Sequence, residues 1–187
     1  MMPAPAPAPS PYAAQELIGQ LLLQRACVTG TKLALQAAVS LMRALVFAIG
    51  TTTPYLNDEF QDLRFVITER VVNGWPVWAA VGGKWFMHRT TANATRITDD
   101  ATCAESVLSY IVNTTPNAAG VAPTELPSSG WISKAIAALP SQYASARPHA
   151  VGGGWKYVPN MRITAVHGLG NDDPAMAEAL QKLAALA

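Results

Sequence analysis

The chain has 187 residues, of which 50% are hydrophobic and only 13% are charged. Thirteen lysines and arginines against twelve acidic residues give a formal net charge of +1, without a basic run, so the electrostatic signature of a nucleic-acid-binding protein is missing. The length suits one domain with an additional arm. Because a domain of this size cannot bury half of its residues, the low charge indicates a surface that a partner partly covers.

Proline and alanine alternate in residues 1–11. Such a segment is typical of a semi-extended polyproline arm. It has neither the basic start nor the apolar stretch of a secretory signal peptide, which favours a cytoplasmic location.

Residues 12–50 are expected to form a helical hairpin. A Ser-Pro pair at residues 10–11 is suited to the start of a helix that continues to Val28, and polar residues recur every four positions along it. A Thr-Gly-Thr break then separates a second helix. We expect this helix to end near Ile49, because Gly50 is a suitable residue for terminating it.

The second helix is the most apolar segment of the chain. Three interpretations stay open: it packs on the body of the protein, it docks into a partner subunit, or it associates with a membrane. Lys32 and Arg43 leave an uncharged run too short for a membrane span, which disfavours the third. The side chains on this segment assigned to an interface with a partner protein or a second copy are Leu35, Val39, Met42 and Val46.

A tryptophan-rich body is expected over residues 55–168. β-Branched residues, an Asn73-Gly74 pair typical of a tight hairpin and a second, Gly-Gly turn predict an antiparallel meander. Pro76 cannot donate a ladder hydrogen bond, so we expect it at a sheet edge or a bulge. The expected strands cover residues 64–72, 75–81, 85–91, 95–98, 107–112, 155–158 and 161–166.

Two further segments complete the expected architecture. Residues 116–154 are rich in proline, alanine, serine and glycine and predict ordered loop, with a short helix over 132–139. An Asn-Asp-Asp-Pro sequence predicts the start of a final helix over residues 171–187. The fold class is therefore α+β, with an N-terminal helical hairpin, a small antiparallel β-meander body and a C-terminal helix.

Part of the body follows the pattern NG-x-P-V-[YW], an aromatic strand, and a closing W-x-x-x-P-x-[VM]-R-[VI]. The residues that carry it are Asn73, Gly74, Pro76, Trp78, Trp155, Pro159 and Arg162. This pattern resembles a tryptophan-rich β module that recurs in predicted proteins of marine microalgae, and it spans residues 65–166. The alanine- and proline-rich segment at 130–154 is longer than in that module. The resemblance implies a β fold and, since the module has no established activity, implies no function.

The sequence contains no recognisable catalytic motif. His88, His149 and His167 lack the spacing to another ligand that metal sites use, so we expect no metal, and no cofactor signature is found. Cys27 suits a buried position on a helix, and a disulfide with Cys103 stays open.

Five tryptophans lie in the body. Their rings can fill the core of the sheet, form a protein interface, or make a platform for a flat ligand, and these alternatives stay open. The tryptophans assigned to partner binding are Trp75, Trp78 and Trp85.

These features favour a non-enzymatic structural or protein-interaction subunit of a larger assembly, tethered by its arm and its apolar helix. The alternative is a ligand-binding β domain that stacks a carbohydrate on exposed tryptophans. An enzyme of an unfamiliar type is the third hypothesis.

Overall fold

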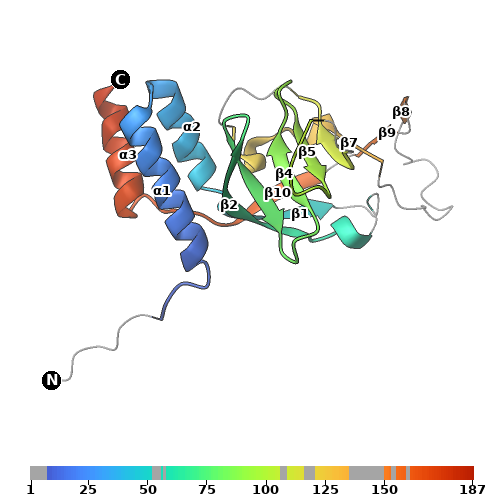
Figure 1. Cartoon of the computed structure of the whole chain (residues 1–187), viewed down its shortest axis with the longest axis horizontal. Helices are drawn as coiled ribbons and strands as arrows, with labels where there is room; N and C mark the ends of the chain where they lie inside the picture. Colours follow the sequence, from blue (N-terminus) through green and yellow to red (C-terminus); the bar gives the residue numbers. More distant parts are fainter. Residues whose placement is uncertain are drawn as a thin grey trace.

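A computed structural model describes the protein over residues 8–51, 56, 58–105, 109–115, 121–134, 150–152, 155–158 and 161–187. Helices α1 (Ala13–Thr29), α2 (Lys32–Met42) and α3 (Pro174–Ala185) pack together at one end of a curled antiparallel sheet (Figure 1). The predicted α+β class is confirmed. Most of the expected proline-alanine arm lies outside the described residues.

The sheet is a half-barrel rather than the simple meander that we expected. Its strands are β1 (Val46–Thr51), β2 (Arg64–Val72), β3 (Trp75–Ala80), β4 (Phe86–Arg89), β5 (Thr95–Thr98), β6 (Ile111–Asn113), β7 (Trp131–Ser133), β8 (Ala150–Gly152), β9 (Trp155–Tyr157) and β10 (Met161–His167). The strand order is β10-β1-β2-β3-β4-β5-β6-β7-β9-β8. From β1 to β7 each strand lies beside the next in the chain, whereas β10 returns to pair with β1, with Ile49 opposite Ile163.

The prediction that the second helix continues to Ile49 is wrong. Helix α2 ends at Met42, and the chain then enters β1. The carbonyls of the turn bind elsewhere instead of continuing the helix: that of Met42 accepts from the Leu169 N–H at 2.9 Å, and that of Leu45 from the Ile67 N–H at 2.8 Å. Tertiary partners therefore take the carbonyl groups that another helical turn would need. The β body consequently begins about ten residues before the expected boundary at residue 55.

The hairpin between β2 and β3 confirms the expected tight turn. Asn73 and Gly74 have φ angles of 52° and 75°, the positive pair that a type I′ turn requires. Pro76 lies opposite Val71, next to a register shift between Ile67 and Val71. The expectation of a bulge near Pro76 is met, but the strand is central and not an edge.

Two further predictions about segment type have different outcomes. Asp173 caps α3, because its Oδ1 accepts from the N–H groups of Ala175 and Met176 at 2.9 and 3.2 Å, as the acidic start of the final helix predicts. The short helix expected over 132–139 is wrong at its start, since Trp131–Ser133 forms β7 and pairs with β6 and β9. The rest of that segment lies outside the described residues.

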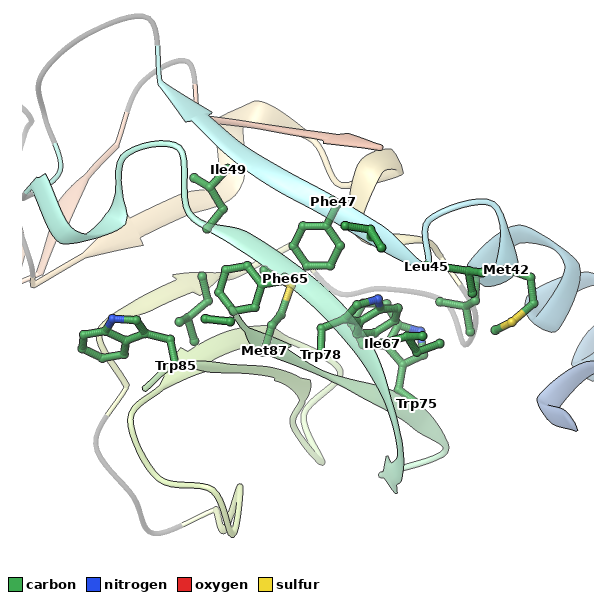
Figure 2. Close-up of a cluster of buried hydrophobic side chains, with 14 of the residues drawn as sticks. Met42, Leu45, Phe47, Ile49, Phe65, Ile67, Trp75, Trp78, Trp85 and Met87 are labelled. Atoms are coloured by element: carbon green, nitrogen blue, oxygen red, sulfur yellow. The ribbon is translucent and has the colours of Figure 1, made fainter. Parts of the chain in front are cut away.

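Aromatic side chains fill the concave side of the sheet (Figure 2). Phe47 of β1 stacks on Phe65 of β2, with ring centroids 5.2 Å apart, and lies 5.8 Å from Trp78 of β3. Trp75 meets Trp78 edge-on at 5.2 Å. Such offset and edge contacts suit the quadrupoles of the rings. The core thus joins three neighbouring strands through their aromatic residues.

Helix α1 is tied to the chain's C-terminal elements. Glu16 Oε1 lies 2.8 Å from Nε2 of His167 at the end of β10, and the ring of Tyr12 stacks on the same imidazole at 4.7 Å. Gln20 Nε2 donates to Oδ2 of Asp173, the cap of α3, at 2.9 Å. These contacts hold α1 in one orientation against the β body, so one face of the helix points away from the body.

Candidate functional site

The seven side chains assigned to partner binding all lie in the protein's own core, at most 6% exposed. They are Leu35, Val39, Met42, Val46, Trp75, Trp78 and Trp85. These side chains pack against the sheet and the neighbouring helices, and their assignment to a partner interface stays a prediction. Their burial agrees with the interpretation that the apolar helix packs on the body of the protein.

Burial closes most of the tryptophan rings to a flat ligand. Four of the five rings are almost fully buried: Trp75, Trp78, Trp85 and Trp131. Trp85 is enclosed by Phe60 and Tyr110, at centroid distances of 4.5 and 4.8 Å. Trp155 is half-buried, and Nζ of Lys134 lies 4.9 Å from its ring centroid. A carbohydrate stacking on an open tryptophan face finds no such face among the four buried rings.

An apolar groove lies beside these buried residues, between α1, α2 and the β2–β3 turn. Its volume is about 250 Å³, and all of its lining residues are uncharged. The lining residues are Leu22, Ala26, Ala34, Ala37, Ala38, Leu41, Met42, Val71, Gly74 and Pro76. Of the seven predicted residues, Met42 reaches this groove, as part of its floor.

The groove exists because α2 presents small side chains on one side. Ala34, Ala37, Ala38 and Leu41 follow the i, i+3, i+4, i+7 spacing that lines one face of a helix. Three of these four are alanine, so the helix surface is recessed where larger side chains would fill the space. The Thr31 hydroxyl accepts from the Ala34 N–H at 3.3 Å and caps the helix at this end.

The opposite wall is fixed by the β2–β3 turn. Asn73 Nδ2 donates to the carbonyl of Arg89 at 2.8 Å and to Oε1 of Glu105 at 3.1 Å, which holds the turn to the strand beyond it. Val71, 49% exposed, projects at the rim beside Gly74. A preformed wall of this kind reduces the ordering cost of binding. The groove is thus an open apolar channel between two stiff supports.

A second set of exposed apolar side chains lies on α1. Leu17, Leu21 and Val28 are 57%, 43% and 84% exposed, while Leu23 of the same helix is fully buried. Gly19 allows the close approach of α1 to the body, since a Cβ there would stand 2.8 Å from Cδ2 of Leu45. Large apolar residues therefore occupy both sides of this helix, a pattern that a helix facing only water does not show.

Polar groups converge under the segment 99–105, on the other side of the β2–β3 turn. Arg96 Nη2 lies 2.5 Å from Oε2 of Glu105, and the Thr91 N–H donates to Oε1 of Glu105 at 2.8 Å. Arg70 donates to the carbonyls of Ala101 and Thr102. Partial burial opposes ionisation of Glu105, but the Thr91 N–H, the Arg96 charge and the Asn73 amide hold its pKa below the ordinary value.

His88 is fully buried beside these arginines. Its Nδ1 lies 3.1 Å from the carbonyl of Arg89, so Nδ1 carries the proton, and its Nε2 has no hydrogen-bond partner within the described part of the chain. Burial lowers the pKa of His88, the contact with the Arg89 carbonyl opposes this, and the Arg96 charge lowers it further. The imidazole is therefore neutral, and the surrounding charges are engaged in holding the loop.

The remaining reactive groups are dispersed. Among the described residues, no three or more His, Cys, Asp or Glu side chains gather in a way that could hold a metal ion. Cys27 and Cys103 are both free thiols, so the disulfide that the sequence left open is not formed. None of the helices within the described ranges combines the length and hydropathy needed to cross a membrane.

Sequence reasoning selected the large, buried side chains of α2 and not the alanines of that helix that line the groove. The lining residues that were not selected include Ala34, Ala37, Ala38 and Val71. The spacing of the alanines was a usable signal, whereas the contribution of Val71 depends on how the hairpin sits against the helices.

Comparison with protein-family models, with curated proteins and with solved structures finds no match to this chain. The resemblance to the tryptophan-rich β module stays a prediction.

Proposed function

We propose that this protein is a non-enzymatic interaction subunit whose groove between α1, α2 and the β2–β3 turn takes an apolar helix or strand of a partner protein. The β body is the rigid support, and the groove is the binding surface. The observation that carries the proposal is the uncharged lining of an open, preformed channel next to exposed apolar side chains on the same helical layer.

The shape of the groove favours a peptide segment over a small polar ligand. Its lining offers apolar contact along α2 and few polar atoms with which to orient sugar hydroxyl groups. An apolar helix face laid into a groove is a common recognition mode, in which side chains at i, i+3, i+4 and i+7 are the anchors. The recessed alanines of α2 leave room for such anchors.

The experiment places a photoreactive p-benzoylphenylalanine at Ala34 of the full chain, in the native host. Ala34 is exposed at the rim of the groove. The control places the same group at Val81, 65% exposed in the turn after β3 and away from the groove. We expect one discrete adduct from Ala34 and none of that size from Val81.

The partner protein in the adduct is then identified and purified without the crosslink. Its affinity for this chain is measured by titration calorimetry. Ala34→Glu and Ala37→Glu introduce a charge into the apolar channel and are expected to weaken binding by about tenfold or more, that is by about 1.4 kcal/mol. Leu33→Glu is the matched control, because Leu33 is on the same helix, 77% exposed and outside the lining. Equal affinity of all three variants and the unmodified chain, or failure to obtain a specific adduct, would contradict the proposal.

A further inference from the structure

We infer that Asn73 is a site of covalent self-modification, where deamidation releases the β2–β3 turn from the segment 99–105. The chain has seven asparagines, and Asn73 is the one that precedes a glycine. Both Asn73 and Gly74 are exposed at the tip of the turn. The inference concerns the chemistry of this turn and does not depend on what the groove binds.

The reaction needs no reagent other than water. The backbone nitrogen of Gly74 gives up its proton and bonds to Cγ of Asn73, the Cγ–Nδ2 bond breaks, and ammonia leaves. The resulting succinimide ring is then opened by one water molecule at either of its carbonyl groups. The product is aspartate, or isoaspartate in which the main chain runs through Cγ. In sum one amide is exchanged for a carboxylate, with no change of oxidation state.

Glycine at position 74 favours ring closure. A side chain on the attacking residue hinders the approach of its nitrogen to Cγ, and glycine has none. The space around this residue is open as well, since no atom lies within 4 Å of the position that a Cβ would take at Gly74. Water therefore reaches both the nitrogen that attacks and the ring that it forms.

The folded turn restrains the carboxamide of Asn73. Its Nδ2 donates to the carbonyl of Arg89 at 2.8 Å and to Oε1 of Glu105 at 3.1 Å. Both bonds must break before Cγ can swing toward the Gly74 nitrogen. The reaction therefore proceeds from the fluctuations in which the turn opens, and such local openings are most frequent at exposed turns and loops.

The product cannot restore these contacts. A carboxylate only accepts hydrogen bonds, and both partners of the original amide, the Arg89 carbonyl and the Glu105 carboxylate, are acceptors too. The new negative charge also repels that of Glu105. Isoaspartate in addition lengthens the main chain by one atom, which the type I′ turn does not accommodate. Each opening that ends in reaction is thus made permanent.

A change at this turn reaches the groove. Gly74 and Val71 line its wall, and the two bonds of Asn73 hold that wall to β4 and to the segment 99–105. Deamidation removes both bonds in one step. The modification therefore converts a rigid wall into a loose one without altering any apolar side chain of the groove.

Peptide mapping by mass spectrometry on the full chain, incubated at pH 7.5 and 37 °C, tests the site. Asn93 is the matched control: it is exposed, has a φ of 63°, and accepts from Nη2 of Arg89 at 2.7 Å, but it precedes Ala94. We expect aspartate and isoaspartate to accumulate at Asn73 at least about tenfold faster than at Asn93. Equal rates at the two positions, or an Asn73 that stays intact, would overturn the inference.

Two variants of Glu105 test the restraint. Glu105→Ala and Glu105→Gln both remove the charge that pairs with Arg96, but glutamine keeps a side-chain oxygen that can accept from Asn73. Circular dichroism confirms that both variants keep their fold. We expect Asn73 to deamidate several times faster in Glu105→Ala than in Glu105→Gln. The same rate in both variants would show that the bond to Glu105 does not restrain the amide.

The release of the turn is measured on the product itself. Asn73→Asp reproduces the aspartate, and Asn73→Gly removes the same hydrogen bonds without adding a charge and suits the positive φ of 52°. We expect hydrogen exchange at the Thr91 amide, which donates to Glu105 at 2.8 Å, to be fastest in Asn73→Asp. Exchange in Asn73→Asp as slow as in the unmodified chain would contradict the release.

Discussion

Trp78 donates its indole N–H to the carbonyl oxygen of Ala44 at 3.1 Å, and this bond joins the middle of the sheet to the turn that ends α2. The ring is fully buried between Phe47 and Trp75, so its single polar atom meets a carbonyl that water does not reach. A buried tryptophan generally needs such a partner. Here the partner is also the group that would otherwise continue the helix.

Trp78→Phe should therefore destabilise the protein by more than the loss of ring size. The carbonyl of Ala44 loses its donor in a buried site, and we expect the free energy of unfolding to fall by about 2–4 kcal/mol. Urea unfolding followed by circular dichroism measures the change. The control, Trp155→Phe, removes a half-buried ring and is expected to cost less than about 1 kcal/mol. Equal losses in the two variants would contradict the role assigned to the Ala44 bond.

Gly168→Ala is expected to push the backbone at residue 168 away from the backbone at Arg43. A Cβ at Gly168 would stand 2.2 Å from the carbonyl oxygen of Arg43, a contact that backbone atoms cannot relieve by rotation. Separation would lengthen the bond from the Leu169 N–H to Met42 and lower the unfolding free energy by about 1–3 kcal/mol. The matched control is Gly50→Ala, where no atom lies within 4 Å of the added carbon. Thermal unfolding of both variants distinguishes close approach from a general effect of replacing glycine.

The stability of the protein should depend on pH through His88. Its pKa is lowered in the folded state, whereas the unfolded chain binds a proton near the ordinary value of about 6.5. The unfolded state therefore binds more protons once the pH falls below that value. Stability present at neutral pH is lost as the pH falls from about 6.5 toward the lowered folded pKa.

His88→Gln is neutral throughout and should flatten this dependence. Unfolding free energies are measured between pH 7.5 and 5, because Glu105, whose pKa is also lowered, begins to titrate only below that range. The charged groups near the imidazole are Arg70, Arg96 and Glu105. The comparison is His167→Gln: a slope that disappears in this variant and persists in His88→Gln would refute the assignment.

The loop over residues 99–105 should depend on the ion pair between Arg96 and Glu105. Glu105→Gln leaves the largely buried guanidinium without its carboxylate, and we expect a loss of about 1–3 kcal/mol with faster hydrogen exchange at the Thr91 amide. Lys84 and Glu59 form a comparable pair at 2.6 Å, but both are well exposed. Glu59→Gln should therefore change stability by less than about 1 kcal/mol. Similar effects of the two substitutions would show that burial does not distinguish the pairs.

Local sequence patterns were sufficient to predict the turns and helix caps. The Asn73-Gly74 turn and the acidic cap at Asp173 were predictable because turn and cap geometry depend on a few adjacent residues. The extension of the second helix through Val46 was wrong for the opposite reason. Apolar residues there fit a helix and a buried strand equally well, and the choice depends on pairing with β2 and β10, whose residues are remote in the sequence.

The candidate site was likewise predictable only in part from the sequence. The helical spacing of Ala34, Ala37 and Ala38 is visible in the sequence. Which face is covered depends on contacts such as Gln20 with Asp173, which no local pattern reveals. The large side chains of α2 were assigned to an interface because the helix is so apolar, and in the structure they pack inward, as large apolar residues usually do.

The pairing of β1 with β10 delays the completion of folding during synthesis. Ile49 leaves the ribosome well before its partner Ile163 and the cap of α3 are made. Contacts between such distant residues slow folding, since a long loop must close before they form. Until then α1 and α2 lack α3, which packs against both helices, and β1 lacks β10, which makes the incomplete chain prone to aggregation. A chain that ends before β10 should therefore need chaperones continuously, and a stop codon near residue 160 is expected to eliminate the protein rather than shorten it.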